Sequence, residues 1–263
     1  MSLLVRTEGA VRILVNSNPA ARNAITPELY DALPAALNEA AADPAIGAIV
    51  FAGDGDFFCA GGDLRQLATR RDLTIPERLE KIGRLHDQIR ALRACPKPVI
   101  AAVEGGAAGA GMSLALACDM LVAAQDAFFT MAYIKVGLSP DGGATAFLSQ
   151  FLPRQQMMEL CLLGERIPAA RLYALGAVNR LVEPGTAVEE ALRLAERIAG
   201  GPANAAARIK RLCENAGHAS LGEQLDLEAA LMAESQGDDE AQEGIRAFFE
   251  KRAPDFASLR GKH

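Results

Sequence analysis

The chain has 263 residues, of which 50% are apolar, and it carries a formal net charge of −6. This length suits one large domain or a domain with an appendage, and the absence of a basic stripe excludes nucleic acid as an expected partner. No apolar run approaches the roughly 20 residues of a membrane-spanning helix, and the first residues lack the pattern of a signal peptide. We therefore expect a cytoplasmic protein without a membrane partner.

Short strands and helices are predicted to alternate over the first part of the chain, up to about residue 185. Apolar periodicity and β-branched residues define each element. The predicted elements in chain order are a hairpin over 3–9 and 11–17, a helix over 27–43, a strand over 47–53, a helix over 76–94, a strand over 97–105, strand-like residues over 120–132 and a helix that begins near Gly143. This order predicts an α/β core.

Only amphipathic helices are predicted after Pro184. Their ranges are 187–200, 202–216, 220–236 and 238–252. Helices that carry apolar faces next to a complete core commonly cover a substrate or pack on another subunit. Five scattered cysteines without a CxxC pair and only three histidines predict reduced thiols and no metal site.

A glycine-rich stretch, GGAAGAGMSLALACD, follows the strand predicted over 97–105. It lacks the lysine of a phosphate-binding loop and the third glycine of a dinucleotide fingerprint. What remains is a strand-to-helix turn, with the helix expected to begin near Met112. Backbone amides at such a helix start can donate to an oxyanion. The alternative is that the small residues serve only close packing.

A second turn of small residues occurs in GDFFCAGGDLRQL, after the strand predicted over 47–53. Ala60, Gly61 and Gly62 precede Asp63, which suits a helix N-cap. Two turns that each present one backbone amide would form an oxyanion hole with two donors.

These two turns resemble the patterns AGxDL and GxxxGxGxxLALxCD of the crotonase (enoyl-CoA hydratase/isomerase) superfamily. Further segments lie in the order of that family: ARNAIT, KPVIAAVEG, VGLSPDGGAT, GERIPAARLYALGAVNRLV and FFEKRAPDF. The resemblance implies a ββα spiral core over residues 1–200 and a helical trimerisation region over 201–263. It also implies an acyl-CoA thioester as ligand, no cofactor beyond the CoA of the substrate, and a homotrimer or a hexamer.

Carried onto this sequence, the resemblance assigns the two oxyanion amides to Ala60 and Ala110. It implies that CoA is bound by residues around two loops and near the chain end of a neighbouring subunit; these are Arg22, Ala24, Ala60, Asp63, Leu64 and Lys251. From the residue alone, Arg22 is equally well interpreted as a solvated loop charge.

The sequence departs from the family at the two positions where hydratases carry glutamates. Ser113 and Tyr133 occupy them. Paired carboxylates activate water by general acid/base transfer. Ordinary two-glutamate hydration is therefore not expected.

One carboxylate, Asp141 in LSPDGGAT, falls where isomerases of ring-derived CoA esters carry a functional aspartate. The alternative interpretation is a helix N-cap in a turn. His86 and Tyr133 fall at functional positions of the related dehalogenase, although a helix-surface histidine and a core-filling tyrosine are open alternatives. Because the chain has no tryptophan, the dehalogenase site is incomplete.

The glycine-rich turn and the Asp141 segment are most similar to the phenylacetate-degradation branch of the family, which includes a ring-epoxide isomerase and an alternative oxepin-CoA hydrolase. The preferred hypothesis is isomerisation of an unsaturated or ring-derived CoA ester, with Asp141 as acid/base. A hydratase or hydrolase in which Asp141 activates water is the second hypothesis. A non-catalytic acyl-CoA-binding protein is the third.

Overall fold

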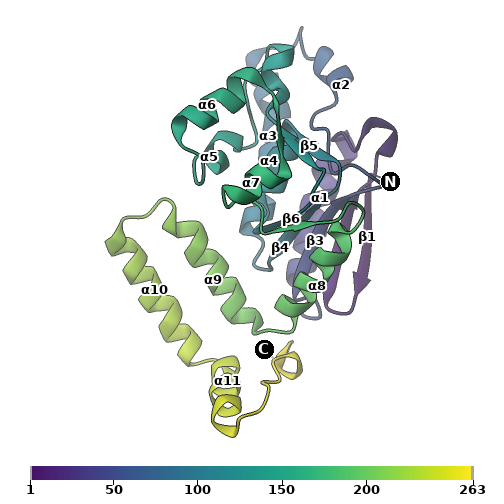
Figure 1. The fold of residues 1–263 in the computed structure, drawn as a ribbon. Coiled ribbons are helices and arrows are strands. Elements are labelled where there is room, and N and C mark those ends of the chain that lie inside the picture. The colour runs from purple at the N-terminus through teal and green to yellow at the C-terminus, as the bar shows by residue number, and fades with distance from the viewer. Residues whose placement is uncertain (1, 262–263) are drawn as a thin grey trace.

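A six-stranded sheet forms the centre of the computed structural model, which describes residues 2–261 (Figure 1). β1 and β2 form the predicted antiparallel hairpin, and the later neighbours pair in parallel. Parallel neighbours require crossover connections, which helices supply here. In spatial order the strands are β1 (Leu3–Glu8), β2 (Val11–Asn16), β3 (Ala48–Gly53), β4 (Val99–Val103), β6 (Met120–Ala124) and β9 (Arg180–Val182).

Helices cover both faces of this sheet, which explains why its central strands β3 and β4 are apolar on both sides. Successive side chains of β3 point to opposite faces. Phe51 packs in one core with Leu33 of α1 (Pro27–Ala42), and α3 (Ile75–Ala94) covers the same side. Val50 packs in a second core with Ala195 of α8 (Ala187–Ala199). The layers are therefore helix, sheet and helix.

A smaller sheet of three strands lies beside the main one, made of β5 (Gly106–Ala108), β7 (Phe128–Thr130) and β8 (Arg166–Pro168). Two stretches that were each predicted as one element contain more than one in the structure. The glycine-rich stretch contains strand β5 as well as a turn, and the strand-like residues 120–132 split into β6 and β7. The small sheet thus holds the glycine-rich turn in place.

Several short helices surround the small sheet and the loops next to it. The helix after the glycine-rich turn begins at Ala110, earlier than the expected Met112. The helix expected near Gly143 begins at Ala144. These helices are α2 (Leu64–Ala68), α4 (Ala110–Ala117), α5 (Ala144–Leu148), α6 (Arg154–Leu163) and α7 (Ala169–Ala174).

The remaining helices form an arm that extends from the core, with α11 at its end (Figure 1). They are α9 (Ala203–Ala216), α10 (Leu221–Gln236) and α11 (Asp239–Glu250), as the sequence predicted. Lys210 of α9 ties the arm to the core, because its Nζ atom lies 2.8 Å from the Asp119 carboxylate. Among the described residues, no helix is both long and apolar enough to cross a membrane. The division at residue 200 falls between α8 and α9, and the domain and trimerisation assignments stay predictions.

The packing of α4 gives the first testable prediction. A methyl group at Gly111 would lie 2.3 Å from the Cys59 carbonyl oxygen, whereas one at Gly83, on α3, would meet nothing within 4 Å. Gly111→Ala should therefore destabilise the fold by about 1–3 kcal/mol through overpacking. Gly83→Ala, the matched control, should be neutral or stabilise it by up to about 1 kcal/mol. Urea unfolding of both variants measures the difference, and equal effects would contradict the close packing of α4.

Candidate active site

Two turns lie side by side, one after Cys59 and one after β5, where Cys59 forms an isolated parallel bridge with Ala107. The Ala108 amide donates to the Cys59 carbonyl at 2.9 Å, and the Cys59 amide donates to the Gly106 carbonyl at 3.3 Å. Gly61 has a φ of 88°, and a methyl group there would lie 2.5 Å from the Ala108 carbonyl oxygen. Only glycine permits both the conformation and this approach. The two turns that the sequence singled out are therefore in contact.

The hydrogen bonds of the first turn decide which of its amides is free. The Ala60 amide donates to the Arg22 carbonyl at 2.9 Å, which corrects the expectation that this amide faces a ligand. The Gly61 amide donates to the Cys59 sulfur at 3.4 Å. The Gly62 amide, in contrast, has no acceptor among residues 2–261. A free donor thus lies two positions after the expected one.

The second turn also presents a free amide. Ala110 is the first residue of α4, and first-turn amides have no acceptor within their own helix. Its amide donates to no atom of the described chain, and its nitrogen lies 3.1 Å from the position that a Gly61 methyl group would take. The Gly62 and Ala110 amides therefore belong to turns in direct contact. The positive end of α4 adds to their attraction for an anion.

Cys59 lies beneath the first turn and is fully buried. Burial raises the pKa of its thiol to about 12, which the weak bond from the Gly61 amide only partly offsets. The thiol therefore stays neutral at physiological pH and serves as a packing residue and a weak acceptor.

A polar cluster joins three elements next to the second turn. Tyr133, in the 3₁₀ helix η2 (Ala132–Val136), donates its hydroxyl to Oδ1 of Asp141 at 2.8 Å. Ser113 of α4 donates its hydroxyl to the Asp141 carbonyl at 3.0 Å. Gly142 permits this approach, since a methyl group there would lie 2.9 Å from the Ser113 Cβ. The two residues at the glutamate positions of the family thus both bind Asp141.

Asp141 is not the N-cap of the helix that follows it. Helix α5 begins at Ala144, its N-cap is Gly143, and no side chain caps it. The alternative that Asp141 is only a cap is therefore wrong. Its Oδ2 atom accepts no hydrogen bond from the part of the chain that the structure describes. One carboxylate oxygen is held by Tyr133 and the other is free to act on a ligand.

Tyr133, which binds this carboxylate, also lies next to the second turn. A methyl group on Gly109, the residue before Ala110, would lie 3.7 Å from the Tyr133 ring. Burial raises the pKa of the Tyr133 hydroxyl far above its ordinary value, and the negative charge of Asp141 raises it further. Tyr133 therefore remains a proton donor to Asp141 throughout the physiological range.

His86 is not joined to this cluster by any hydrogen bond among residues 2–261. It lies half-buried on α3, next to Leu85, whose methyl carbon would lie 3.3 Å from a methyl group at Gly142. The neighbouring Asp87 pairs with Arg90 at 2.8 Å. A catalytic role of His86 stays a prediction.

The predicted CoA residues of the core lie around the first turn. Asn23 is fully buried, and its side chain donates to the Asp54 carbonyl at 2.8 Å, which fixes the loop of Arg22 and Ala24 beside this turn. The Arg22 guanidinium lies 5.7 Å from the Phe57 ring centroid. Asp63 caps α2 by accepting the Arg65 amide at 2.9 Å, as predicted. Leu64 is exposed beside it.

Lys251 lies elsewhere. It follows the last residue of α11, and Figure 1 places α11 at the opposite end of the molecule from α2. A single chain therefore does not bring Lys251 to the loop of Arg22 and Ala24. The expectation that this lysine acts on a neighbouring subunit requires a second copy and stays a prediction.

The family model described as enoyl-CoA hydratase/isomerase matches residues 6–259. The chain belongs to this family. Among solved structures, an enoyl-CoA hydratase from Polaromonas sp. JS666 superposes with a TM-score of 0.93 at 46% identity, covering 96% of this chain and 98% of that one. The fold is thus the crotonase fold, and the protein is an enzyme of the family that acts on acyl-CoA thioesters.

Relatives within the enoyl-CoA hydratase/isomerase family carry different activities. The chain is 34% identical to a 1,2-epoxyphenylacetyl-CoA isomerase of Escherichia coli over 255 residues, which cover 97% of each chain. It is also 34% identical to a 2,3-dehydroadipyl-CoA hydratase of the same organism, over 97% of this chain and 98% of that one. Identity alone therefore does not choose between isomerase and hydratase.

The buried tyrosine gives a prediction about pH. A group whose pKa is raised in the folded state keeps its proton when the unfolded chain loses it, so its contribution to stability is present below about pH 10 and is lost above it. Tyr133→Phe should therefore lose less stability than the wild type between about pH 9 and pH 11. The measurement is urea unfolding at both pH values, with Tyr173→Phe, at a half-exposed position, as control. An identical pH dependence in all three proteins would contradict the burial of the hydroxyl.

Proposed function

We propose that the protein isomerises an unsaturated or ring-derived acyl-CoA ester, with Asp141 as the single acid/base. The observation that carries the proposal is the hydrogen bond of 2.8 Å from Tyr133 to Oδ1 of Asp141. It holds one carboxylate oxygen and leaves Oδ2 without a donor in the described chain. The glutamates with which hydratases of the family bind water are replaced by Ser113 and Tyr133, whose hydroxyls serve Asp141 instead.

The thioester carbonyl is proposed to bind between the Gly62 and Ala110 amides. Removal of a proton next to this carbonyl moves negative charge onto its oxygen, as an enolate. Two preorganised amide donors stabilise that charge more than the ground-state carbonyl, and each is typically worth about 3–4 kcal/mol of barrier. This assignment is supported because both amides lack a hydrogen-bond acceptor in the described chain and because their turns are in contact.

Asp141 then moves the proton within the substrate. Its Oδ2 atom takes a proton from one carbon of the acyl group, the C–H electron pair passes into the enolate, and the carboxylic acid returns the proton to another carbon. The double bond shifts, and no atom is gained or lost. Tyr133 keeps its own proton because its pKa is raised, and so it orients the carboxylate in both states.

Addition of water is the second candidate function. It is favoured by relatives that are named hydratases at the same identity as the isomerase. In that reaction Asp141, the carboxylate of the polar cluster, would activate a water molecule next to the bound acyl group. A non-catalytic acyl-CoA-binding role is the outcome if no substrate is turned over.

CoA is proposed to lie along the loop of Arg22 and Ala24, past Ala60, Asp63 and Leu64, with Lys251 contributed by a second copy. Assembly into a homotrimer or hexamer is supported by apolar side chains that the arm exposes. Phe248 and Phe249 are 79% and 77% exposed, and Leu221 is 76% exposed. Exposed apolar groups of this kind commonly mark subunit contacts. A location in the cytoplasm is part of the same proposal.

Asp141→Asn tests the acid/base assignment. Asparagine keeps the size and the acceptor for Tyr133 but carries no base, so turnover should fall about 10²–10⁴-fold. We would incubate wild type and variant with unsaturated and ring-derived acyl-CoA esters in heavy water and measure the molecular masses of the products by mass spectrometry. Deuterium uptake without added water supports the isomerase, and gain of the mass of water supports the hydratase. Full turnover by the variant would exclude Asp141.

Ala110→Pro tests the oxyanion hole. Proline suits the first position of a helix, so α4 should form, but the amide donor is removed. Turnover should fall about 10²–10³-fold while circular dichroism stays unchanged. Activity equal to the wild type in a folded variant would show that this amide is not used.

A further inference from the structure

The backbone at Lys251 has a conformation that lysine seldom adopts. Its φ and ψ are 52° and 39°, in the left-handed region, and it ends α11. The Lys251 amide donates to the last carbonyls of the helix, and the Arg252 amide donates to the Ala247 carbonyl at 3.1 Å. Glycine is the usual residue here, because a Cβ disfavours this region. The chain therefore keeps a lysine where the turn alone would select glycine.

Only three non-glycine residues of the described chain have a positive φ: Arg22, Asn23 and Lys251. Asn23 is explained by its buried side chain, which holds the loop together. Arg22 and Lys251 are exposed, and both are residues to which we assign contacts with CoA. Unfavourable backbone conformations persist where the surrounding structure enforces them and occur frequently at functional sites.

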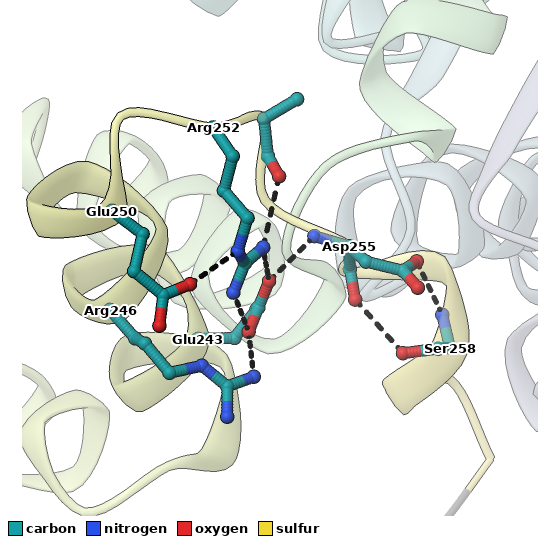
Figure 2. Close-up of polar contacts among 7 residues, drawn as sticks. Glu243, Arg246, Glu250, Arg252, Asp255 and Ser258 are labelled. Atoms are coloured by element: carbon teal, nitrogen blue, oxygen red, sulfur yellow. Dashed lines mark hydrogen bonds and ion pairs between the residues drawn. The ribbon is translucent and has the colours of Figure 1, made fainter.

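A buried carboxylate, that of Glu243, binds Arg252 and the Asp255 amide in the segment that follows Lys251 (Figure 2). Glu243 is only 4% exposed. Arg252 binds it through two parallel hydrogen bonds, of 2.6 Å to Oε1 and 3.0 Å to Oε2. The Asp255 amide donates to Oε1 at 2.9 Å, and Arg246 donates to Oε2. Glu243 on α11 thus binds the chain directly after Lys251.

The segment after Lys251 is fixed by further contacts. The Asp255 side chain accepts the Ser258 amide at 3.1 Å, and the Asp255 carbonyl accepts the Ser258 hydroxyl at 3.1 Å (Figure 2). The Phe256 ring packs on α11, where a methyl group at Gly244 would lie 3.5 Å from it. The helix before Lys251 and the segment after it are therefore bound to each other, which restrains the turn between them.

We propose that Glu243 is a positioning residue for substrate binding, which holds the turn so that the Lys251 ammonium group meets the phosphates of an acyl-CoA bound to a second copy of the chain. This inference rests on the proposed role of Lys251. Glu243 itself touches no substrate. It acts through the Arg252 pair and the Asp255 amide, which set the direction in which the lysine leaves the helix.

A double-mutant cycle on acetyl-CoA binding tests the proposal, with Lys251→Gly, Glu243→Gln and both together. Lys251→Gly removes the charge but suits the left-handed turn, so the affinity should fall about threefold to tenfold while the thermal midpoint rises by about 2–4 °C. Glu243→Gln should weaken binding by a similar factor. In the Lys251→Gly background, Glu243→Gln should not weaken binding further, because Glu243 acts on the ligand only through Lys251.

Two controls separate positioning from general damage. S-acetyl-pantetheine lacks the nucleotide and every phosphate of CoA, so its affinity should be the same in all variants. Arg246→Ala removes a partner of Glu243 whose side chain is 61% exposed and that does not hold the turn, so it should bind acetyl-CoA like the wild type. If Glu243→Gln does not assemble, Arg252→Gln breaks the same pair from the other side and is tested in the same cycle.

The outcomes distinguish the two proposals. An unchanged affinity of Lys251→Gly would overturn the role of Lys251, and the positioning role would fall with it. Weaker binding by Lys251→Gly with unchanged binding by Glu243→Gln would overturn the positioning role alone. Additive losses in the double variant would also overturn it, because Glu243 would then act by a route other than Lys251.

Discussion

The close approach of Gly61 to the Ala108 carbonyl is the contact on which the site depends. No side chain fits between the two turns, since even a methyl group at Gly61 would lie 2.5 Å from that oxygen. The parallel sheet and the small sheet hold the turns at this separation. As a result, the Gly62 and Ala110 amides belong to adjoining turns and are both free. The two free donors are therefore a product of backbone geometry, which the sequence records only as small residues.

The hydrogen bonds around Asp141 determine how its carboxylate is held in the site. Two hydroxyls, of Tyr133 and Ser113, bind its side chain and its backbone. Ser113 belongs to α4, the helix that begins at Ala110, and the Tyr133 ring lies next to Gly109, so the carboxylate and the Ala110 amide keep a fixed relation. One carboxylate held at one oxygen suits the proposed proton transfer within a substrate. The buried Tyr133 hydroxyl stays protonated, so its role is orientation.

The helical arm carries Lys251 on α11, at the opposite end of the molecule from α2. The arm exposes apolar residues at its end and holds a lysine in a left-handed turn by means of a buried carboxylate. Rigid presentation of a charge lowers the entropy lost when it binds a ligand. The same end of α11 carries Phe248, Phe249 and Lys251, so the proposed assembly and the proposed contact with CoA involve one surface.

Periodicity predicted many of the helices and strands, and the resemblance of ordered motifs indicated the family of this protein. The hairpin, the buried strands and all four C-terminal helices follow from local patterns, and ordered motifs identified two turns and Asp141. Tertiary contacts alone decided that Ala60 donates to Arg22, so that Gly62 is the free donor, because amide direction depends on a loop far away in sequence. They also decided that Tyr133, rather than a helix start, binds Asp141. Sequence specifies which groups are present, whereas the folded chain decides which of them remain unpaired.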